Sequence, residues 1–195
     1  MKLVLATSNK GKVREIQSLF EDKEVVPYGE IIQEFEIVED GLTFKENALI
    51  KARAVFKALD DEDVVVIADD SGISVDILDG APGIYSARYG GVDAGDKDNL
   101  YALIDAIKQK GVKSSKAHYT AAIAIVTKTS EYSVHGWMYG DAQAYASGNG
   151  GFGYDPMFIP LGYDKTLGDL DDETKKKLSH RSKALKLTKA ILQTL

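Results

Sequence analysis

The chain has 195 residues, of which 44% are hydrophobic and 28% are charged, and its formal net charge is −6 at pH 7. This length and composition predict one folded domain over residues 1–195 and exclude a long disordered tract. The negative charge argues against nucleic acid or an anionic membrane as a partner, and the absence of cysteine excludes disulfides and thiolate chemistry. No apolar run approaches the roughly 20 residues that cross a bilayer, so we expect a cytoplasmic protein.

The beginning of the chain has the pattern of a strand, a loop and a helix. Residues 3–6 form a short apolar run, and apolar residues recur at helical spacing from 13 to 20. Residues 24–28 predict a second strand, and Pro27 favours an edge position because proline cannot donate a backbone hydrogen bond.

A long helix is predicted next, followed by a buried strand. Thr43 and Glu46 have the capping-box spacing, and an apolar stripe continues behind them to residue 59. Three valines and an isoleucine predict a buried strand over 64–68. Ser71-Gly72 then indicates a turn, and alternating residues over 73–78 indicate a further strand.

The second half of the chain is richer in strands. The patterns predict an amphipathic helix over 98–110 that ends at Gly111, antiparallel strands over 118–128, 132–138 and 141–146, a strand over 157–159, and helices over 171–178 and 182–195. Helices and strands alternate early while strands cluster late. We therefore expect an α/β fold with a mixed sheet.

Asp69 and Asp70 are the first candidates for chemistry. They follow a hydrophobic strand, and side chains at the carboxyl end of such a strand enter the crevice of an open α/β sheet. Paired carboxylates suit Mg²⁺, which is usually coordinated by one or two carboxylates together with waters and substrate phosphates. Asp-Asp-Ser-Gly also has the composition of an ordinary turn, so the spacing alone leaves both interpretations open.

A second candidate is the polar loop Thr7-Ser8-Asn9-Lys10-Gly11-Lys12. Free backbone N–H groups and the dipole at a helix start favour an anion, although an ordinary capped loop with solvated lysines has the same sequence. The G-x-x-x-x-G-K-[ST] string of a P-loop is absent. Lys51 on the long helix and Glu39 on the preceding loop belong to this candidate site only if both reach the acidic pair.

The string Gly148-Asn149-Gly150-Gly151-Phe152-Gly153 matches G-x-G-x-x-G, but its context does not. A dinucleotide motif follows a strand and opens a helix, whereas this loop leads into Tyr154-Asp155-Pro156 and a strand. We reject that interpretation. Phe152 remains a candidate for stacking on a base and Asp155 for accepting its hydrogen bonds, while a simple hairpin with a packed phenylalanine stays open.

Lys175 and Ser179-His180-Arg181 place several hydrogen-bond donors at a helix–helix junction. Donors of this kind suit a carbonyl acceptor, and they also complement a helix dipole without any ligand. The chain has three histidines, none at zinc-ligand spacing, which argues against a zinc site.

Six strings, in this order, resemble the inosine/xanthosine triphosphate pyrophosphatase family. They are Leu5-Ala6-Thr7-Ser8-Asn9-Lys10-Gly11-Lys12, Gly41-Leu42-Thr43-Phe44 with Glu46-Asn47-Ala48, Ala68-Asp69-Asp70-Ser71-Gly72, Gly80-Ala81-Pro82-Gly83-Ile84-Tyr85-Ser86-Ala87-Arg88-Tyr89, Gly150-Gly151-Phe152-Gly153-Tyr154-Asp155-Pro156 and Ser179-His180-Arg181. Ser8 is a local departure, since some members of the family carry glycine there.

The resemblance implies a Mg²⁺-dependent enzyme that hydrolyses the deaminated purine nucleotides ITP, dITP and XTP to the monophosphate and pyrophosphate. It implies that Asp70 is the catalytic proton acceptor, that Glu39 and Asp70 bind the metal, and that Asp69 shapes the field beside them. The implied substrate-binding residues are Thr7, Ser8, Asn9, Lys10, Gly11, Lys12, Lys51, Ser71, Phe152, Gly153, Tyr154, Asp155, Lys175, His180 and Arg181. It also implies a mixed, twisted central sheet flanked by helices, with two lobes around a nucleotide-binding cleft, and a homodimer.

Two alternatives remain. One is a related pyrophosphatase for other modified bases, as in the septum-inhibitor relatives, and the other is a nucleotide sensor without catalysis. The acidic residues favour catalysis, because a protein that only binds a triphosphate has little need of several carboxylates beside it.

Overall fold

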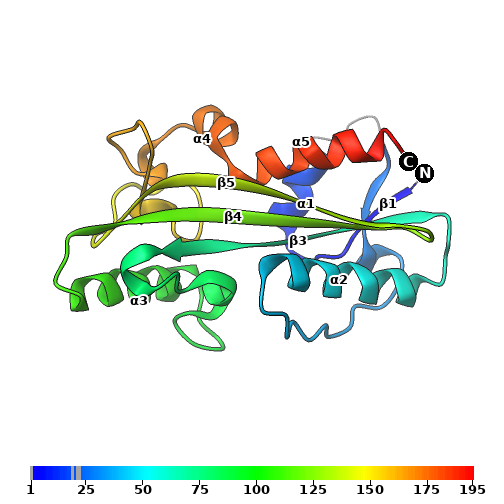
Figure 1. Ribbon diagram of the computed structural model, residues 1–195, viewed down its shortest axis with the longest axis horizontal. Helices are drawn as coiled ribbons and strands as arrows, with labels where there is room; N and C mark the ends of the chain where they lie inside the picture. Colours follow the sequence, from blue (N-terminus) through cyan, green and yellow to red (C-terminus); the bar gives the residue numbers. More distant parts are fainter. Residues whose placement is uncertain (1, 19, 21–22) are drawn as a thin grey trace. The chain divides into compact units, whose positions relative to one another are not determined.

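A computed structural model describes residues 2–18, 20 and 23–195; of Lys10 and Glu15 it describes only the backbone. The strands are β1 Lys2–Leu5, β2 Val25–Pro27, β3 Val64–Val75, β4 Ser114–Val126, β5 Glu131–Gln143 and β6 Phe158–Pro160 (Figure 1). The α-helices are α1 Lys10–Gln17, α2 Phe44–Leu59, α3 Asp96–Gln109, α4 Asp172–Leu178 and α5 His180–Leu192. Among the described residues, no helix is both long enough and apolar enough to cross a membrane.

The sheet of the described residues has six strands in the order β2-β1-β3-β4-β5-β6. β1 runs parallel to β2 and to β3, whereas β5 and β6 are antiparallel. The predicted α/β class with a mixed sheet flanked by helices is therefore confirmed, as is the edge position of β2.

The chain divides into two compact units. Unit 1 comprises Met1–Asp70, Ala121–His135 and Ala184–Leu195, and unit 2 comprises Ser71–Thr120 and Gly136–Lys183. The long strands β3, β4 and β5 contribute residues to both units. The nucleotide-binding cleft stays a prediction.

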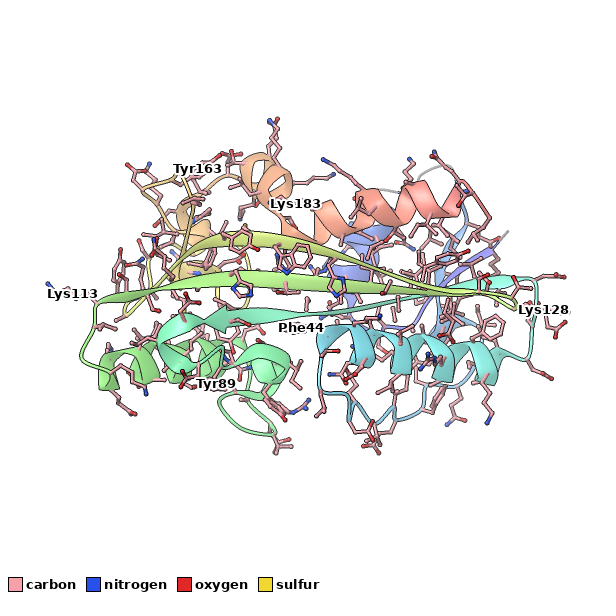
Figure 2. The ribbon with its side chains drawn as sticks, viewed as in Figure 1. Phe44, Tyr89, Lys113, Lys128, Tyr163 and Lys183 are labelled. Atoms are coloured by element: carbon pink, nitrogen blue, oxygen red, sulfur yellow. The ribbon has the colours of Figure 1, made fainter. Side chains whose placement is uncertain are left out.

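Unit 1 has one apolar cluster on each face of its strands, because successive side chains of a strand point to opposite sides. Leu3, Leu5, Val65 and Ile67 pack with α1 and α5, while alternate residues such as Val66 pack with α2 (Figure 1). Figure 2 labels Phe44, the first residue of α2. These two layers explain the near-continuous apolar runs of β1 and β3.

Unit 2 is built on one cluster in which α3 packs against β3, β4 and β5. Leu103, Ile104 and Ile107 of α3 contact residues such as Ile73 and Phe158, and Tyr89, labelled in Figure 2, packs at its margin. α3 is followed by Gly111 at φ +74°, in the left-handed region where glycine often ends helices.

The predicted turn at Ser71-Gly72 is wrong, because β3 continues through it to Val75. Gly72 is needed for a close approach instead: a Cβ there would collide with Ser86 Oγ and Gly83 O, within the 3₁₀ helix Gly83–Arg88. The predicted strand over 73–78 is thus the end of β3, followed by a 3₁₀ turn at Asp76–Leu78.

The predicted separation of strands 132–138 and 141–146 is also wrong, since β5 runs without a break from Glu131 to Gln143, and residues 144–146 lie beyond its end. Gly140 lies inside this strand, where a Cβ would collide with Ile159 O and the Phe158 ring. The capping box is half formed: Thr43 Oγ1 accepts from the Glu46 amide, but the Glu46 carboxylate accepts from Leu42 N rather than from Thr43 N.

Candidate active site

Asp69 and Asp70 lie in the middle of β3 and point to opposite faces of the strand. This follows from strand geometry, which alternates side chains between the two faces. Asp69 shares the face that α1 covers, and Asp70 shares the face that α2 covers. Two acids that are adjacent in the sequence therefore have different partners.

Asp69 is paired with Lys12 of α1. Lys12 Nζ lies 2.7 Å from Asp69 Oδ2, and the same ammonium approaches the Asp69 carbonyl oxygen at 3.4 Å. The Asp69 side chain is fully buried, so this carboxylate is held by a fixed ion pair.

Asp70 and Glu39 share a single lysine. Lys51 Nζ of α2 lies 2.7 Å from Glu39 Oε2 and 3.1 Å from Asp70 Oδ1. Burial lowers the pKa of Lys51, but the carboxylates of Asp70 and Glu39 outweigh it and raise this pKa above its usual value. The predicted convergence of Glu39, Lys51 and Asp70 is thus present within unit 1.

Burial raises the pKa of Asp70, and the nearby Glu39 carboxylate raises it further, while Lys51 and Lys12 act in the opposite direction. The Oδ2 atom of Asp70 is buried and has no hydrogen-bond partner among the described residues. A carboxylate with one such oxygen has a lone pair ready for a proton or a cation.

The loop before α1 supplies its own cap. Asn9 Oδ1 accepts from the amides of Gly11 and Lys12 at 2.9 and 3.1 Å, and Thr7 Oγ1 accepts from Asn9 N at 3.2 Å. The expectation of free N–H groups at this helix start is therefore wrong for these two amides. Ser8 is exposed on the same loop, and the side chain of Lys10 lies outside the described part of the chain.

Glu39 and Asp70 fit the requirements of Mg²⁺, although the described residues contain no group of three or more Asp, Glu, His or Cys side chains placed to hold a metal. Magnesium is usually held by one or two carboxylates, with waters and substrate phosphates completing its octahedron. The buried Oδ2 of Asp70, without a donor among the described residues, is a suitable ligand atom.

Unit 2 gathers the predicted base-binding residues around the junction of α4 and α5. Arg181 is buried, and its Nη2 donates to Ser71 Oγ at 3.0 Å. His180 is also buried, and its ring lies parallel to that of Tyr119, with centroids 4.8 Å apart and planes 15° apart. Lys175 Nζ lies 2.7 Å from Asp172 Oδ1.

The loop from Phe152 to Asp155 has one internal hydrogen bond and two hydrogen bonds to other segments of unit 2. Asp155 Oδ2 accepts from Phe152 N, Gly153 N donates to Asp96 Oδ2, both at 3.2 Å, and the Tyr154 hydroxyl donates to Ser86 O at 2.6 Å. The Phe152 side chain stays 66% exposed, which leaves its ring available for stacking. The loop leads into a 3₁₀ turn and β6, in agreement with the rejection of a dinucleotide motif.

Burial raises the pKa of Asp155 to about 6, against the opposing effects of the Phe152 amide, Lys175 and Arg181. Tyr119 lies close enough that its hydroxyl also acts on this carboxylate. Sequence reasoning missed Tyr119, because a tyrosine at an inward position of a strand has the pattern of an ordinary core residue. The alternation of apolar and polar residues around Tyr119 in β4 indicates only that its side chain is buried.

Tyr119 is expected to hold the His180 ring in place, since it stacks on His180 and meets Phe158 edge-on at 4.9 Å. An aromatic pair is worth about 0.5–1.5 kcal/mol beyond burial, so Tyr119→Leu should raise the KM for ITP, a substrate that the family resemblance implies, roughly two- to twelvefold. Tyr119→Phe keeps the ring and should stay near the wild type. Steady-state kinetics check this, and an equal KM in Tyr119→Leu and the wild type would contradict it.

The sequence matches the model of the Ham1 family over residues 3–191. The chain belongs to the Ham1 family. This confirms the family resemblance of the ordered motifs. A dITP/XTP pyrophosphatase of Sulfurimonas denitrificans is 69% identical over 199 aligned positions, covering 100% of both chains, and one of Sulfurovum is 59% identical, covering 100% of this chain and 95% of the relative.

Solved structures of Ham1 proteins have the same fold. The Staphylococcus aureus Ham1 protein superposes with a TM-score of 0.89 at 36% identity, covering 100% of this chain and 99% of that one. A Ham1 protein of Coxiella burnetii gives 0.88 at 32% identity, with 100% of both chains covered. The roles of individual site residues stay predictions.

Proposed function

We propose that this Ham1 protein hydrolyses the deaminated purine nucleotides ITP, dITP and XTP to the nucleoside monophosphate and pyrophosphate, and so clears them from the nucleotide pool. The names of its full-length relatives support this substrate class. The observation that carries the proposed catalysis is the placement of Glu39 and Asp70 around Lys51. The buried Oδ2 atom of Asp70 has no partner among the described residues and can accept a proton or bind a cation.

In this proposal Asp70 accepts the proton of the attacking water. Its raised pKa brings it nearer to the working pH, which favours a general base. Glu39 and Asp70 would hold Mg²⁺, which lowers the pKa of a bound water and offsets phosphate charge. Lys12 and Lys51 offset charge on the departing pyrophosphate.

The base would be recognised by the donors of unit 2. Arg181 and His180 would donate to the 6-keto oxygen of hypoxanthine or xanthine, and Phe152 would stack on the ring. An adenine amino group is itself a donor and would leave these donors unsatisfied. A buried unsatisfied donor costs about 1–3 kcal/mol, or roughly 5- to 150-fold in affinity.

The test is to incubate the purified protein and MgCl₂ with ITP, XTP, GTP and ATP and to resolve the products. We expect pyrophosphate and monophosphate from ITP and XTP, with little turnover of ATP. Orthophosphate and diphosphate as products would contradict the proposal. If none of these four nucleotides is hydrolysed but triphosphates with other modified bases are, the related pyrophosphatases are indicated. Tight ITP binding without product would indicate a sensor.

We also propose a homodimer, which the family resemblance implies, and the cytoplasmic location that the sequence led us to expect. Light scattering at assay concentration tests the first, and a monomer would overturn it. Cell fractionation tests the second.

A further inference from the structure

Lys51 lies where a cation between Glu39 and Asp70 belongs. Its ammonium contacts both carboxylates at 2.7 and 3.1 Å, and its side chain is only 12% exposed. These are the two residues proposed to bind the metal. Lys51 thus supplies positive charge to Glu39 Oε2 and Asp70 Oδ1, on the two side chains that would also hold the metal.

We propose that Lys51 competes with the divalent metal for Glu39 and Asp70, so that metal binds tightly only when a nucleotide accepts the displaced ammonium. This inference rests on the proposed function. Lys51 would then make tight metal binding depend on a bound nucleotide, in addition to making its predicted contact with phosphate.

The competition follows from charge and space. A divalent ion bound by the same two carboxylates would place two positive centres within roughly 4 Å, where their repulsion is strong at the low effective dielectric of a buried site. Lys51 therefore has to move, which its flexible four-carbon stem allows. Without nucleotide the moved ammonium loses both carboxylates, whereas phosphate oxygens provide it with new acceptors.

Lys12 offers a matched control in the same unit. It also pairs with a buried β3 carboxylate, but its partner is Asp69, on the opposite face of the strand from Asp70. Lys12→Met and Lys51→Met remove the same charge and keep a similar side-chain length. If the loss of one positive charge were enough to strengthen metal binding, both variants would bind the metal more tightly. If Lys51 competes directly for the metal ligands, only Lys51→Met would do so.

The experiment measures Mn²⁺ binding by electron paramagnetic resonance without nucleotide, at about pH 8, where carboxylates are ionised. We expect Lys51→Met to bind Mn²⁺ roughly tenfold or more tightly than the wild type, and Lys12→Met to differ by less than about threefold. Addition of a non-hydrolysable ITP analogue should tighten Mn²⁺ binding in the wild type far more than in Lys51→Met. Circular dichroism verifies that each variant is folded.

Unchanged or weaker Mn²⁺ binding in Lys51→Met would overturn the competition, as would an equal gain in Lys12→Met. Asp70→Asn should weaken Mn²⁺ binding. Unchanged Mn²⁺ binding in Asp70→Asn would mean that the metal lies elsewhere, and it would also overturn the proposed competition. Product analysis with ITP is independent of these measurements. A wild type that shows the Mn²⁺ pattern without releasing pyrophosphate would refute the proposed function and leave the competition standing.

Discussion

Asp70→Asn is expected to lower ITP turnover by roughly 100- to 10,000-fold, the range that a positioned general base contributes. Asparagine has nearly the same shape, so the fold should be retained, but its amide cannot accept the proton of the attacking water. The buried Oδ2 atom, which has no partner among the described residues, is the atom that the change affects most directly. Pyrophosphate release under saturating ITP and MgCl₂ measures the effect.

Asp69→Asn is the matched comparison, because it removes the neighbouring carboxylate on the other face of β3. That change breaks the pair with Lys12 and should reduce turnover less than Asp70→Asn does. A larger loss in Asp69→Asn would show that the proton acceptor has been assigned to the wrong residue. Thermal unfolding of both variants separates a loss of chemistry from a loss of fold.

Asp155→Asn is expected to stabilise the protein in weakly alkaline buffer and to have little stabilising effect in acid. Burial raises the pKa of Asp155 from the ordinary 3.8 to about 6 in the folded protein. The folded state therefore holds this proton more firmly, and the free energy of unfolding falls as the pH rises through the window between these two values. Asparagine does not ionise and escapes that loss.

The difference amounts to about 2 kcal/mol between about pH 4.5 and about pH 8. Urea unfolding at both pH values measures it, with the exposed Asp93→Asn as the control for a change of one charge. An equal effect of Asp155→Asn at both pH values would mean that Asp155 titrates in its ordinary range. The KM for ITP, measured in parallel, reports whether the carboxylate is also needed for the base.

Much of the fold follows from local pattern. The apolar stripe of α2, the edge position of β2 marked by Pro27, and the end of α3 before Gly111 all follow from propensity and periodicity. The two errors in strand boundaries occurred at Gly72, which was interpreted as part of a turn, and between residues 138 and 141, where Gly140 lies inside β5. Glycine also occurs where another segment approaches a strand closely, and that neighbour is distant in the sequence.

The sequence by itself determined the family, the α/β class and the set of polar residues that carry the proposed chemistry, because ordered motifs and hydrophobic periodicity are local properties. Local pattern left Asp69 and Asp70 nearly equivalent, and the family resemblance assigned the catalytic role to Asp70 without a physical reason. The tertiary structure gives the two residues different partners: β3 continues through the pair, so alternation turns Asp69 towards Lys12 of α1 and Asp70 towards Lys51 of α2. The partner of a strand residue depends on which helix covers its face, and packing between distant segments decides that.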